Sequence, residues 1–513
     1  MKKILIILIF GITLLNAQKH DYNWALGFGF SDTMINKYQG NKVFVMKFGQ
    51  TDLKFDTVFD SYYDLTKQYI IFGGGGTASY SDVNGILKYS TEGKRIYDAS
   101  WNVMQNGDTI NPGVYWNSQK NTYNFIYGVI AIPDPANKND FSYLLHSQII
   151  KIGKNTKPLY SKIDLKMNNG LGAVIKKNIV LNDTINLLEL PMVIQHANGR
   201  DWWVFYHEYK TRLYYKKLLT PDGFIDKGVQ EIGPEESNIF TNVLFSIMSH
   251  NGEKYCRYDR PGKYYLGNFD RCTGELSNFK TLEIPDSLIG YGEMCFSPND
   301  QFIYCTGQSY ESKDNYLAQI DISTDPFTYK IIAHQPFSNT IECNAYSMIE
   351  LGPDGKIYVG TSSYSRCISI INSPDKVFPD CDFQEYVPIL PFFSGGVGMP
   401  HYPNYRLGPL VGSSCDTLSD TNEVTISNEN KIKLYPNPAT SNFTIELMDF
   451  LSHNKDLDVS LVDINGKEYY HSKIPAFAYI HNIDSSNLAS GMYCVLLKDR
   501  FKLLATKKVI VIK

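Results

Sequence analysis

One turn sequence recurs six times along the middle of the chain. Each copy has an apolar segment, a short Asn-Gly, Asn-Asp or Asp-Gly turn and an aromatic segment, as in SDVNGILKYS and QHANGRDWWVFYHE. The turns at residues 84, 139, 198, 251, 299 and 354 are separated by 55, 59, 53, 48 and 55 residues. Asn-Gly and Asp-Gly supply the positive φ angles that tight hairpins require. The turn therefore marks the same point in each of six hairpin units.

The segments around these turns indicate an all-β fold. Between Gln18 and about Leu410, short runs of Tyr, Phe, Val and Ile alternate with polar residues, without helical periodicity. A period near fifty residues with about four strands predicts a β-propeller blade, because β-helix rungs are much shorter. The strands around Trp24–Phe72 and the closing stretch Phe392–Arg406 are expected to form one more blade together. Seven blades are therefore favoured over six.

Composition excludes two classes of protein. Aromatic residues make up 14% of the chain and charged residues 20%, the opposite of what a disordered chain contains. The formal net charge of −4 lacks the basic excess of nucleic-acid binders, so we expect no nucleic-acid partner.

The first 17 residues, MKKILIILIFGITLLNA, have the order of a secretory signal peptide. Two lysines precede an apolar run from Ile4 to Leu15, and the small residue Ala17 precedes Gln18. A bilayer span needs about twenty apolar residues, and neither this run nor any later one is long enough. We expect cleavage between Ala17 and Gln18 and no transmembrane segment.

The sequence changes in character after Pro409. Residues 411–431 are rich in Ser, Thr, Asn and Asp and are predicted to be a linker. Residues 432–513 contain seven short strand-like runs, which predict a small immunoglobulin-like β-sandwich. The expected organisation is a signal peptide at 1–17, a β-propeller at 18–410, a linker at 411–431 and a sandwich at 432–513.

Several segments between residues 80 and 410 are distinctive, among them SDVNGILKYSTEGKRIYDASWNVMQNGD, MNNGLGAV, DRCTGEL and MPHYPNYRLGP. Together they resemble a family of secreted β-propellers from Gram-negative bacteria that use type IX secretion. The resemblance implies fold and export rather than a particular activity.

The tail carries a second set of motifs in a fixed order. These are LYPNPAT (Leu434–Thr440), DINGKEY (Asp463–Tyr469), LASGMYCVLL (Leu488–Leu497) and the terminal KKVIVIK. They resemble the type A C-terminal sorting domain of type IX secretion. The resemblance implies the type IX machinery as a partner, a secreted or outer-surface location, removal of the domain and attachment to surface lipopolysaccharide.

The nine cysteines fit an oxidising compartment. Eight lie between Cys256 and Cys415, and most of these are expected to be oxidised. Cys256 and Cys272 lie sixteen residues apart across a predicted hairpin and are expected to pair, whereas Cys494 is expected to remain free. Close Cys/His spacing is absent, so no metal site is predicted.

Catalytic motifs are also absent. There is no GxSxG elbow, and His207-Glu208 is followed by Thr211 where a zincin would have its second histidine. We predict no catalytic residue and no cofactor. The favoured function is a non-catalytic binding or adhesion module for a glycan or protein ligand. The alternative is a secreted hydrolase or lyase whose active site is dispersed around the propeller funnel.

One polar and aromatic cluster surrounds the third turn, and two interpretations of it are open. Its candidate ligand contacts are His196, Arg200, Asp201, Trp202 and His207. Such side chains bind sugars or peptides through stacking and charge-assisted hydrogen bonds. A His and an Asp beside a hairpin also commonly tie neighbouring strands together, and this structural interpretation is favoured.

Deleting residues 432–513 should leave a folded propeller in the periplasm, because the export machine recognises the tail independently of its cargo. In the full-length chain, cleavage should fall in the polar stretch Ser413–Lys431. Cell fractionation and terminal peptide mapping measure both outcomes. Surface display of the truncated protein, or a mature form that keeps Lys513, would contradict the sorting assignment.

Overall fold

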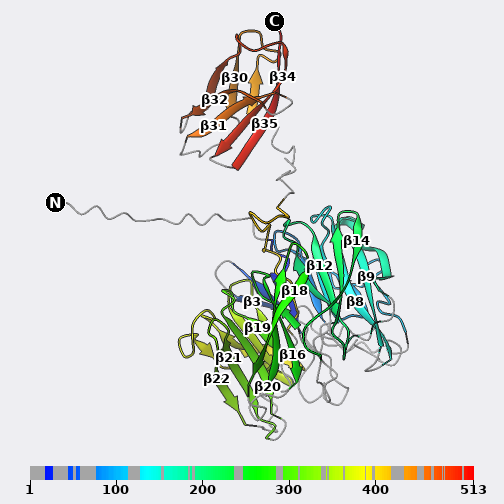
Figure 1. Cartoon of the computed structure of the whole chain (residues 1–513). Helices are drawn as coiled ribbons and strands as arrows, with labels where there is room; N and C mark the ends of the chain where they lie inside the picture. Colours follow the sequence, from blue (N-terminus) through cyan, green and yellow to red (C-terminus); the bar gives the residue numbers. More distant parts are fainter. Residues whose placement is uncertain are drawn as a thin grey trace, which may run out of the picture. The chain divides into compact units, whose positions relative to one another are not determined.

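The chain forms two compact units, Met1–Thr417 (the propeller unit) and Leu418–Lys513 (the tail unit), which are described separately (Figure 1). The computed structural model describes residues 18–26, 44–49, 53–57, 77–113, 128–151, 155–182, 185, 187, 191–235, 246–260, 262–284, 293–309, 312–336, 343, 346–361, 364–387, 389–395, 399–416, 432–447, 456–463, 467–475, 478, 480–499 and 502–513. The expected signal peptide and most of the expected linker lie outside these residues. Within them, no helix is long and apolar enough to cross a membrane.

Seven antiparallel sheets, blades 1 to 7, follow one another along the described part of the propeller unit, each with its strands in chain order (Figure 1). Blades 1 and 2 have three strands each: β1 (Asn23–Leu26), β2 (Phe44–Phe48), β3 (Leu53–Thr57); β4 (Ala78–Ser81), β5 (Leu87–Thr91), β6 (Ile96–Asp98). Blades 3 to 7 have four strands each: β7 (Val129–Pro133), β8 (Phe141–Lys151), β9 (Asn155–Asp164), β10 (Ala173–Val180); β11 (Met192–Gln195), β12 (Trp202–His207), β13 (Leu213–Thr220), β14 (Gly223–Glu231); β15 (Ser246–Met248), β16 (Lys254–Arg260), β17 (Lys263–Asp270), β18 (Glu275–Glu283); β19 (Met294–Phe296), β20 (Phe302–Gln308), β21 (Asn315–Asp321), β22 (Thr328–Gln335); β23 (Tyr346–Leu351), β24 (Ile357–Thr361), β26 (Ser369–Ile371), β27 (Phe383–Gln384). Two further strands, β25 (Tyr364–Cys367) and β28 (Ile389–Gly395), pair with each other, and a short 3-10 helix, η1, spans Asn168–Gly170.

The six recurring turns lie at equivalent positions, between the first and second strands of blades 2 to 7. Gly85, Gly199, Gly252 and Gly355 have φ angles between 71° and 85°, and Asp300 adopts 59°. These are the left-handed conformations that the turn sequences predicted. Successive four-stranded meanders define a β-propeller, and the expected all-β fold is confirmed.

The ring of blades has the first strand of each sheet at its centre. First strands of neighbouring blades contact one another, as in the pairs β1–β4, β4–β7, β11–β15, β15–β19 and β19–β23. The ring closes where blade 1 packs on blade 7. There the Tyr358 ring centroid lies 5.6 Å from those of Trp24 and Phe48.

The expected sharing of one blade by both chain ends is wrong in its details. Within the described residues β1, β2 and β3 form their own sheet, and the closing stretch 392–406 adds no strand to it. Its first part belongs to β28, which pairs with β25. Pro400 and Pro403 then lack the N–H groups that a strand ladder needs. Residues 399–410, named the strap below, instead run across the centre of the ring.

The tail unit is a two-sheet sandwich of seven strands, as predicted (Figure 1). One sheet contains β29 (Ile432–Tyr435), β30 (Asn442–Leu447) and β33 (Ile480–Asp484); the other contains β32 (Glu468–Ile474), β31 (Leu457–Val462), β34 (Gly491–Asp499) and β35 (Lys502–Val511). Alternate apolar residues from both sheets, including Phe443, Ile445, Val459, Val495 and Val509, form its own buried core.

A buried histidine joins blade 3 to the segment that follows blade 2. His146 Nδ1 lies 2.6 Å from Asn111 Oδ1, and its Nε2 lies 2.9 Å from Ser161 Oγ. All three residues are at most 1% exposed, so the arrangement stabilises the fold rather than reacting with a substrate. Burial lowers the pKa of His146 to about 3.

Acid should therefore destabilise the propeller unit. The pKa of His146 is lower in the folded state than the ordinary value near 6.5, so unfolding takes up a proton as pH falls from about 6.5 towards 3. We expect His146→Gln to lose less of its stability between pH 7 and 5 than the native chain. Urea unfolding followed by tryptophan fluorescence measures this, because all five tryptophans belong to the propeller unit. An unchanged pH dependence in the variant would contradict it.

Candidate functional site

The strap crosses the centre of the ring and is bonded to the inner strands. The Tyr402 hydroxyl lies 2.7 Å from Ser79 Oγ on β4 and donates to the Asn23 carbonyl on β1 at 3.2 Å. The Tyr405 hydroxyl donates to the Ala131 carbonyl on β7 at 2.5 Å. Both tyrosines are buried, so the strap fills the channel on the side of blades 1 to 3.

The end of the strap docks on blade 4. The Leu410 N–H donates to the Ala197 carbonyl at 2.8 Å, and the Gly408 N–H donates to Gln195 Oε1 at 2.8 Å. Gly199 lies so close to the chain here that a Cβ would come within 2.5 Å of the Pro409 nitrogen. The glycine of this turn is therefore required for contact with the strap as well as for its φ of 71°.

A cavity of about 210 Å³ remains between the strap and the inner strands of blades 4 to 7. Its walls are mostly apolar strand residues, and the turns of blades 5 to 7 contribute to its rim. The polar residues that line it include Asp21, Ser249, His250, Glu350, His401, Asn404 and Arg406. This cavity, named the funnel cavity, is the candidate functional site.

An ion pair between a buried carboxylate and a partly exposed guanidinium forms one wall of the funnel cavity. Arg406 holds the Asp21 carboxylate with both terminal nitrogens, with Nη1 2.9 Å from Oδ2. Burial raises the pKa of Asp21, and the Arg406 guanidinium opposes that shift. The guanidinium carbon also lies 5.6 Å from the centroid of the Tyr22 ring. The pair is neutral as a whole, and each charge is held by the other.

Glu350 on β23 forms the opposite charged wall. Its Oε2 lies 3.3 Å from His401 Nδ1, and its Oε1 accepts the Tyr402 N–H at 3.4 Å. Burial raises the pKa of Glu350, and its contact with His401 opposes the shift. The strap therefore supplies the partner of each buried carboxylate in the funnel cavity.

The rim is held by bonds between successive turns. The Asp300 carboxylate, from the turn of blade 6, accepts the Asn251 N–H of the blade 5 turn at 2.8 Å and also the His250 N–H. Burial raises the pKa of Asp300 to about 6. Asn404 of the strap donates to the His250 carbonyl at 2.7 Å. The rim is thus preorganised by contacts with the next blade and the strap.

The cluster predicted at the third turn lies beside the strap. Its polar members are brought together: the Asp201 carboxylate accepts bonds from Arg200 Nε at 2.7 Å and Asn198 Nδ2 at 2.9 Å. His196 accepts the Asn198 N–H at Nδ1, while its Nε2 lies 3.0 Å from the Cys272 carbonyl. Of these contacts, the one from His196 joins blade 4 to blade 5, and the others lie within the blade 4 turn.

The remaining members of that cluster point elsewhere. Trp202 is 1% exposed and packs in the central core of the ring. Trp203, on the opposite face of β12, donates from Nε1 to the Arg271 carbonyl at 2.8 Å. His207 is buried at the far end of the strand, beside the Arg257 guanidinium. The funnel cavity contains none of the five predicted contact residues.

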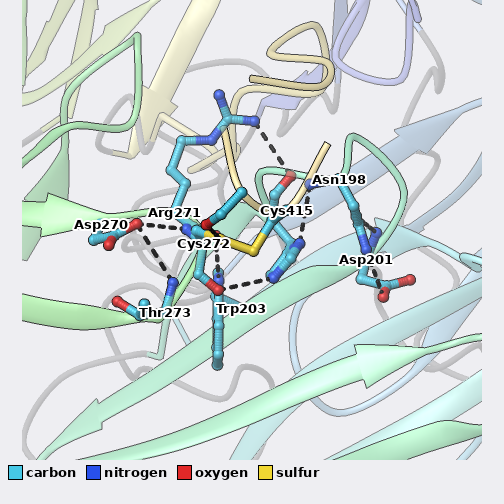
Figure 2. Close-up of a disulfide and its surroundings, with 10 residues drawn as sticks. Asn198, Asp201, Trp203, Asp270, Arg271, Cys272, Thr273 and Cys415 are labelled. Atoms are coloured by element: carbon cyan, nitrogen blue, oxygen red, sulfur yellow. Dashed lines mark hydrogen bonds between the residues drawn. A yellow bond between two sulfur atoms is a disulfide. The ribbon is translucent and has the colours of Figure 1, made fainter. Parts of the chain in front are cut away.

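A disulfide between Cys272 and Cys415 fixes the chain just after the strap (Figure 2). The Cα atoms are 5.6 Å apart, and the neighbouring Arg271 donates from Nε to the Gln195 carbonyl at 2.9 Å. Residues 411–416, expected to belong to the linker, are therefore tied to blade 5.

The expected Cys256–Cys272 pair is wrong. Cys256 lies opposite Leu266 in the β16–β17 ladder, whereas Cys272 lies six residues further on, in the turn that follows β17. A second disulfide joins Cys343 to Cys367. Cys256, Cys295, Cys305 and Cys381 are buried thiols, so half of the eight cysteines between 256 and 415 are oxidised rather than most. The free thiol expected at Cys494 is confirmed.

The tail unit can be assigned from its sequence match. Residues 433–513 match a family model described as a secretion system C-terminal sorting domain. The tail unit is a type IX sorting domain. The protein is therefore secreted and reaches the outer cell surface, and the type IX machinery is its partner in export.

Three solved structures are similar to the chain. They are the WD40 domain of Toxoplasma gondii coronin (9% identity, 52% of this chain and 58% of that one, TM-score 0.31), a quinonprotein alcohol dehydrogenase-like protein from Bacteroides thetaiotaomicron (10%, 62% and 66%, TM-score 0.31) and the β-propeller domain of Myceliophteria thermophila Cps50 (9%, 72% and 92%, TM-score 0.27). The chain spans less than two thirds of the first two proteins. Likeness at this level carries no argument about function, and no curated protein matches the sequence.

The residues that line the funnel cavity were missed by the sequence-based search for sites. Glu350 lies in a repeat strand, whereas His401 and Arg406 belong to MPHYPNYRLGP, which was used only as a motif of resemblance. The available signal was the position of that segment after the last repeat, together with its three prolines and two tyrosines. In the described residues no three His, Cys, Asp or Glu side chains form a metal-binding group.

Thiol counting tests the two disulfides. Denatured, unreduced full-length protein should show five free thiols. Cys272→Ser should raise the count by one, because Cys415 loses its partner, whereas Cys256→Ser should lower it by one. A peptide linking Cys272 to Cys415 should appear after proteolysis. Nine free thiols, or a peptide linking Cys256 to Cys272, would contradict the structure.

Proposed function

We propose that the propeller unit is a non-catalytic binding module that the sorting domain delivers to the cell surface. The observation that carries this proposal is the engagement of the funnel carboxylates by the strap. Asp21 is held by Arg406, and Glu350 lies against His401. A catalytic acid or base must reach its substrate. Carboxylates already paired within the fold are better suited to orient a ligand than to transfer protons.

The chemistry of the funnel cavity favours a neutral, hydrogen-bonding ligand. Asp21 and Arg406 balance each other's charge, and Glu350 is hydrogen-bonded to the strap, so a strongly charged ligand gains little there. Sugar hydroxyls or amides, by contrast, can bond to the carboxylate oxygens. A volume of about 210 Å³ is below the roughly 300–1,000 Å³ of sites for drug-sized ligands. The cavity therefore suits one terminal group of a surface glycan or peptide.

The propeller unit is proposed to stay on the surface after export. The sorting domain supports removal of the tail and attachment of the mature protein to lipopolysaccharide. A binding face displayed in this way acts as an adhesion module. Its ligand is then a glycan or protein outside the cell.

A secreted hydrolase or lyase is the second candidate function, and one observation favours it. Glu350 is buried, borders the funnel cavity and has a raised pKa beside an imidazole. General acids have these properties. Its hydrogen bonds to the strap favour binding over this alternative.

Glu350→Gln separates the two functions, because glutamine keeps the shape of the side chain and removes its charge. We expect binding to an array of neutral glycans and peptides to weaken by about ten-fold or more, the usual effect of losing a charged hydrogen-bond partner. Glu283→Gln, an exposed change on β18, is the control. Products released from the bound glycans by the native chain, but not by Glu350→Gln, would overturn the non-catalytic function.

A further inference from the structure

A second cavity, of about 510 Å³, lies between blades 3 and 4. Its walls come from β8, β9 and β10 of blade 3 and from the β13–β14 hairpin of blade 4, which are neighbours in Figure 1. This second cavity is named the groove, and no residue lines both the groove and the funnel cavity. The groove is therefore separate from the site of the proposed function.

Three aromatic rings form the apolar part of the groove. The Tyr160 centroid lies 5.0 Å from that of Phe224 and 5.6 Å from that of Tyr143, and the Tyr143 and Phe224 centroids are 5.7 Å apart. Tyr143 is buried in the central core, and Tyr160 and Phe224 pack against that core while staying partly exposed. The rings are thus a fixed platform with faces open to a ligand.

Two lysines face each other beside this platform. Lys162 on β9 and Lys176 on β10 are register partners, so their side chains leave the same face of the sheet. Directly opposed like charges are unfavourable unless each has a counter-charge. Lys162 has one, because its Nζ lies 2.5 Å from Asp134 Oδ2. Lys176 is exposed and forms no ion pair with any residue that the structure describes.

The blade 4 wall, as far as the structure describes it, offers no second free cation. Lys217 lies 2.8 Å from Asp226 Oδ2 across blade 4, so this pair is closed within the wall. The Tyr160 hydroxyl, by contrast, makes no hydrogen bond within the described residues. Tyr160 and Lys162 are two residues apart on β9, so their side chains lie on the same face of the sheet. The groove thus combines aromatic faces, a free phenol and one unneutralised ammonium group on the blade 3 wall, and the exposed Asp222 carboxylate also lines it on the blade 4 wall.

We propose that this groove binds an acidic sugar, a pyranose that carries a carboxylate. Its apolar ring face would lie on Tyr160 and Phe224, and its carboxylate would pair with Lys176. That contact neutralises the charge left by the two opposed lysines. A sugar is favoured over an acidic peptide because the donors in the groove are side-chain tips, whereas grooves for extended peptides bond to main-chain groups.

Two matched sugars test the site on the full-length chain: methyl β-D-glucuronide and methyl β-D-glucoside, which differ only in the carboxylate. Titration followed by saturation-transfer NMR should show tighter binding of the glucuronide. Lys176→Gln should weaken binding of the glucuronide about three-fold or more and leave binding of the glucoside unchanged. Lys227→Gln, an exposed lysine on β14 outside the groove, should change neither. Phe224→Ala should weaken binding of both sugars by the same factor.

Four outcomes would overturn the proposal. They are equal affinity for the two sugars, equal effects of Lys176→Gln and Lys227→Gln, tighter binding of an N-acetylated aspartate amide than of the glucuronide, and absence of binding by the native chain. A fifth outcome, loss of glucuronide binding in Glu350→Gln but not in Lys176→Gln, would also overturn it and would place the sugar in the funnel cavity. A negative result with these sugars would not affect the proposed function of the funnel cavity, which the array experiment with Glu350→Gln tests separately. Tryptophan fluorescence verifies that each variant is folded.

Discussion

The hydrogen bonds of the strap to the inner strands are the interaction on which the ring depends. A strand next to the central channel has main-chain carbonyls with no neighbouring strand on that side, and buried carbonyls need partners. The strap supplies such partners: the Tyr402 hydroxyl donates to the Asn23 carbonyl of blade 1, and the Tyr405 hydroxyl donates to the Ala131 carbonyl of blade 3. The ring thus closes through aromatic packing between blades 1 and 7 and through a cross-channel segment, rather than through a shared sheet.

The same segment determines what the channel can bind. It fills the side of blades 1 to 3 and brings Arg406 and His401 to the carboxylates of Asp21 and Glu350. Without these partners two buried carboxylates would line the cavity unpaired, and burial would favour their protonated forms. Stability and ligand chemistry therefore depend on the same side chains, whereas the groove between blades 3 and 4 is built from blade residues alone.

Local patterns predicted the blades and the tail, because turn chemistry and strand alternation act over a few residues. The six turns and the seven tail strands lie where the sequence placed them. The funnel cavity depends on contacts between residues far apart in the sequence, such as Asp21 and Arg406, for which no local pattern exists. The Cys272–Cys415 disulfide was not predicted for the same reason: its two cysteines are 143 residues apart, and spacing across a hairpin favoured the nearer Cys256 as the partner of Cys272. In the cluster around the third turn, Trp202 packs in the central core and Trp203 bonds to Arg271 of blade 5, contacts that composition alone does not predict.

The order of elements along the chain has a consequence for assembly. The strap follows every blade, and Cys415 follows the strap, so the strap contacts need residues 399–410 and the disulfide that fixes the strap needs residue 415. The disulfide then forms in an oxidising compartment, outside the cytoplasm. The sorting domain comes next in sequence, at 433–513. A chain that carries the sorting domain therefore already contains all the residues that close its ring. A chain truncated before residue 415 lacks both the Cys272–Cys415 disulfide and the sorting domain.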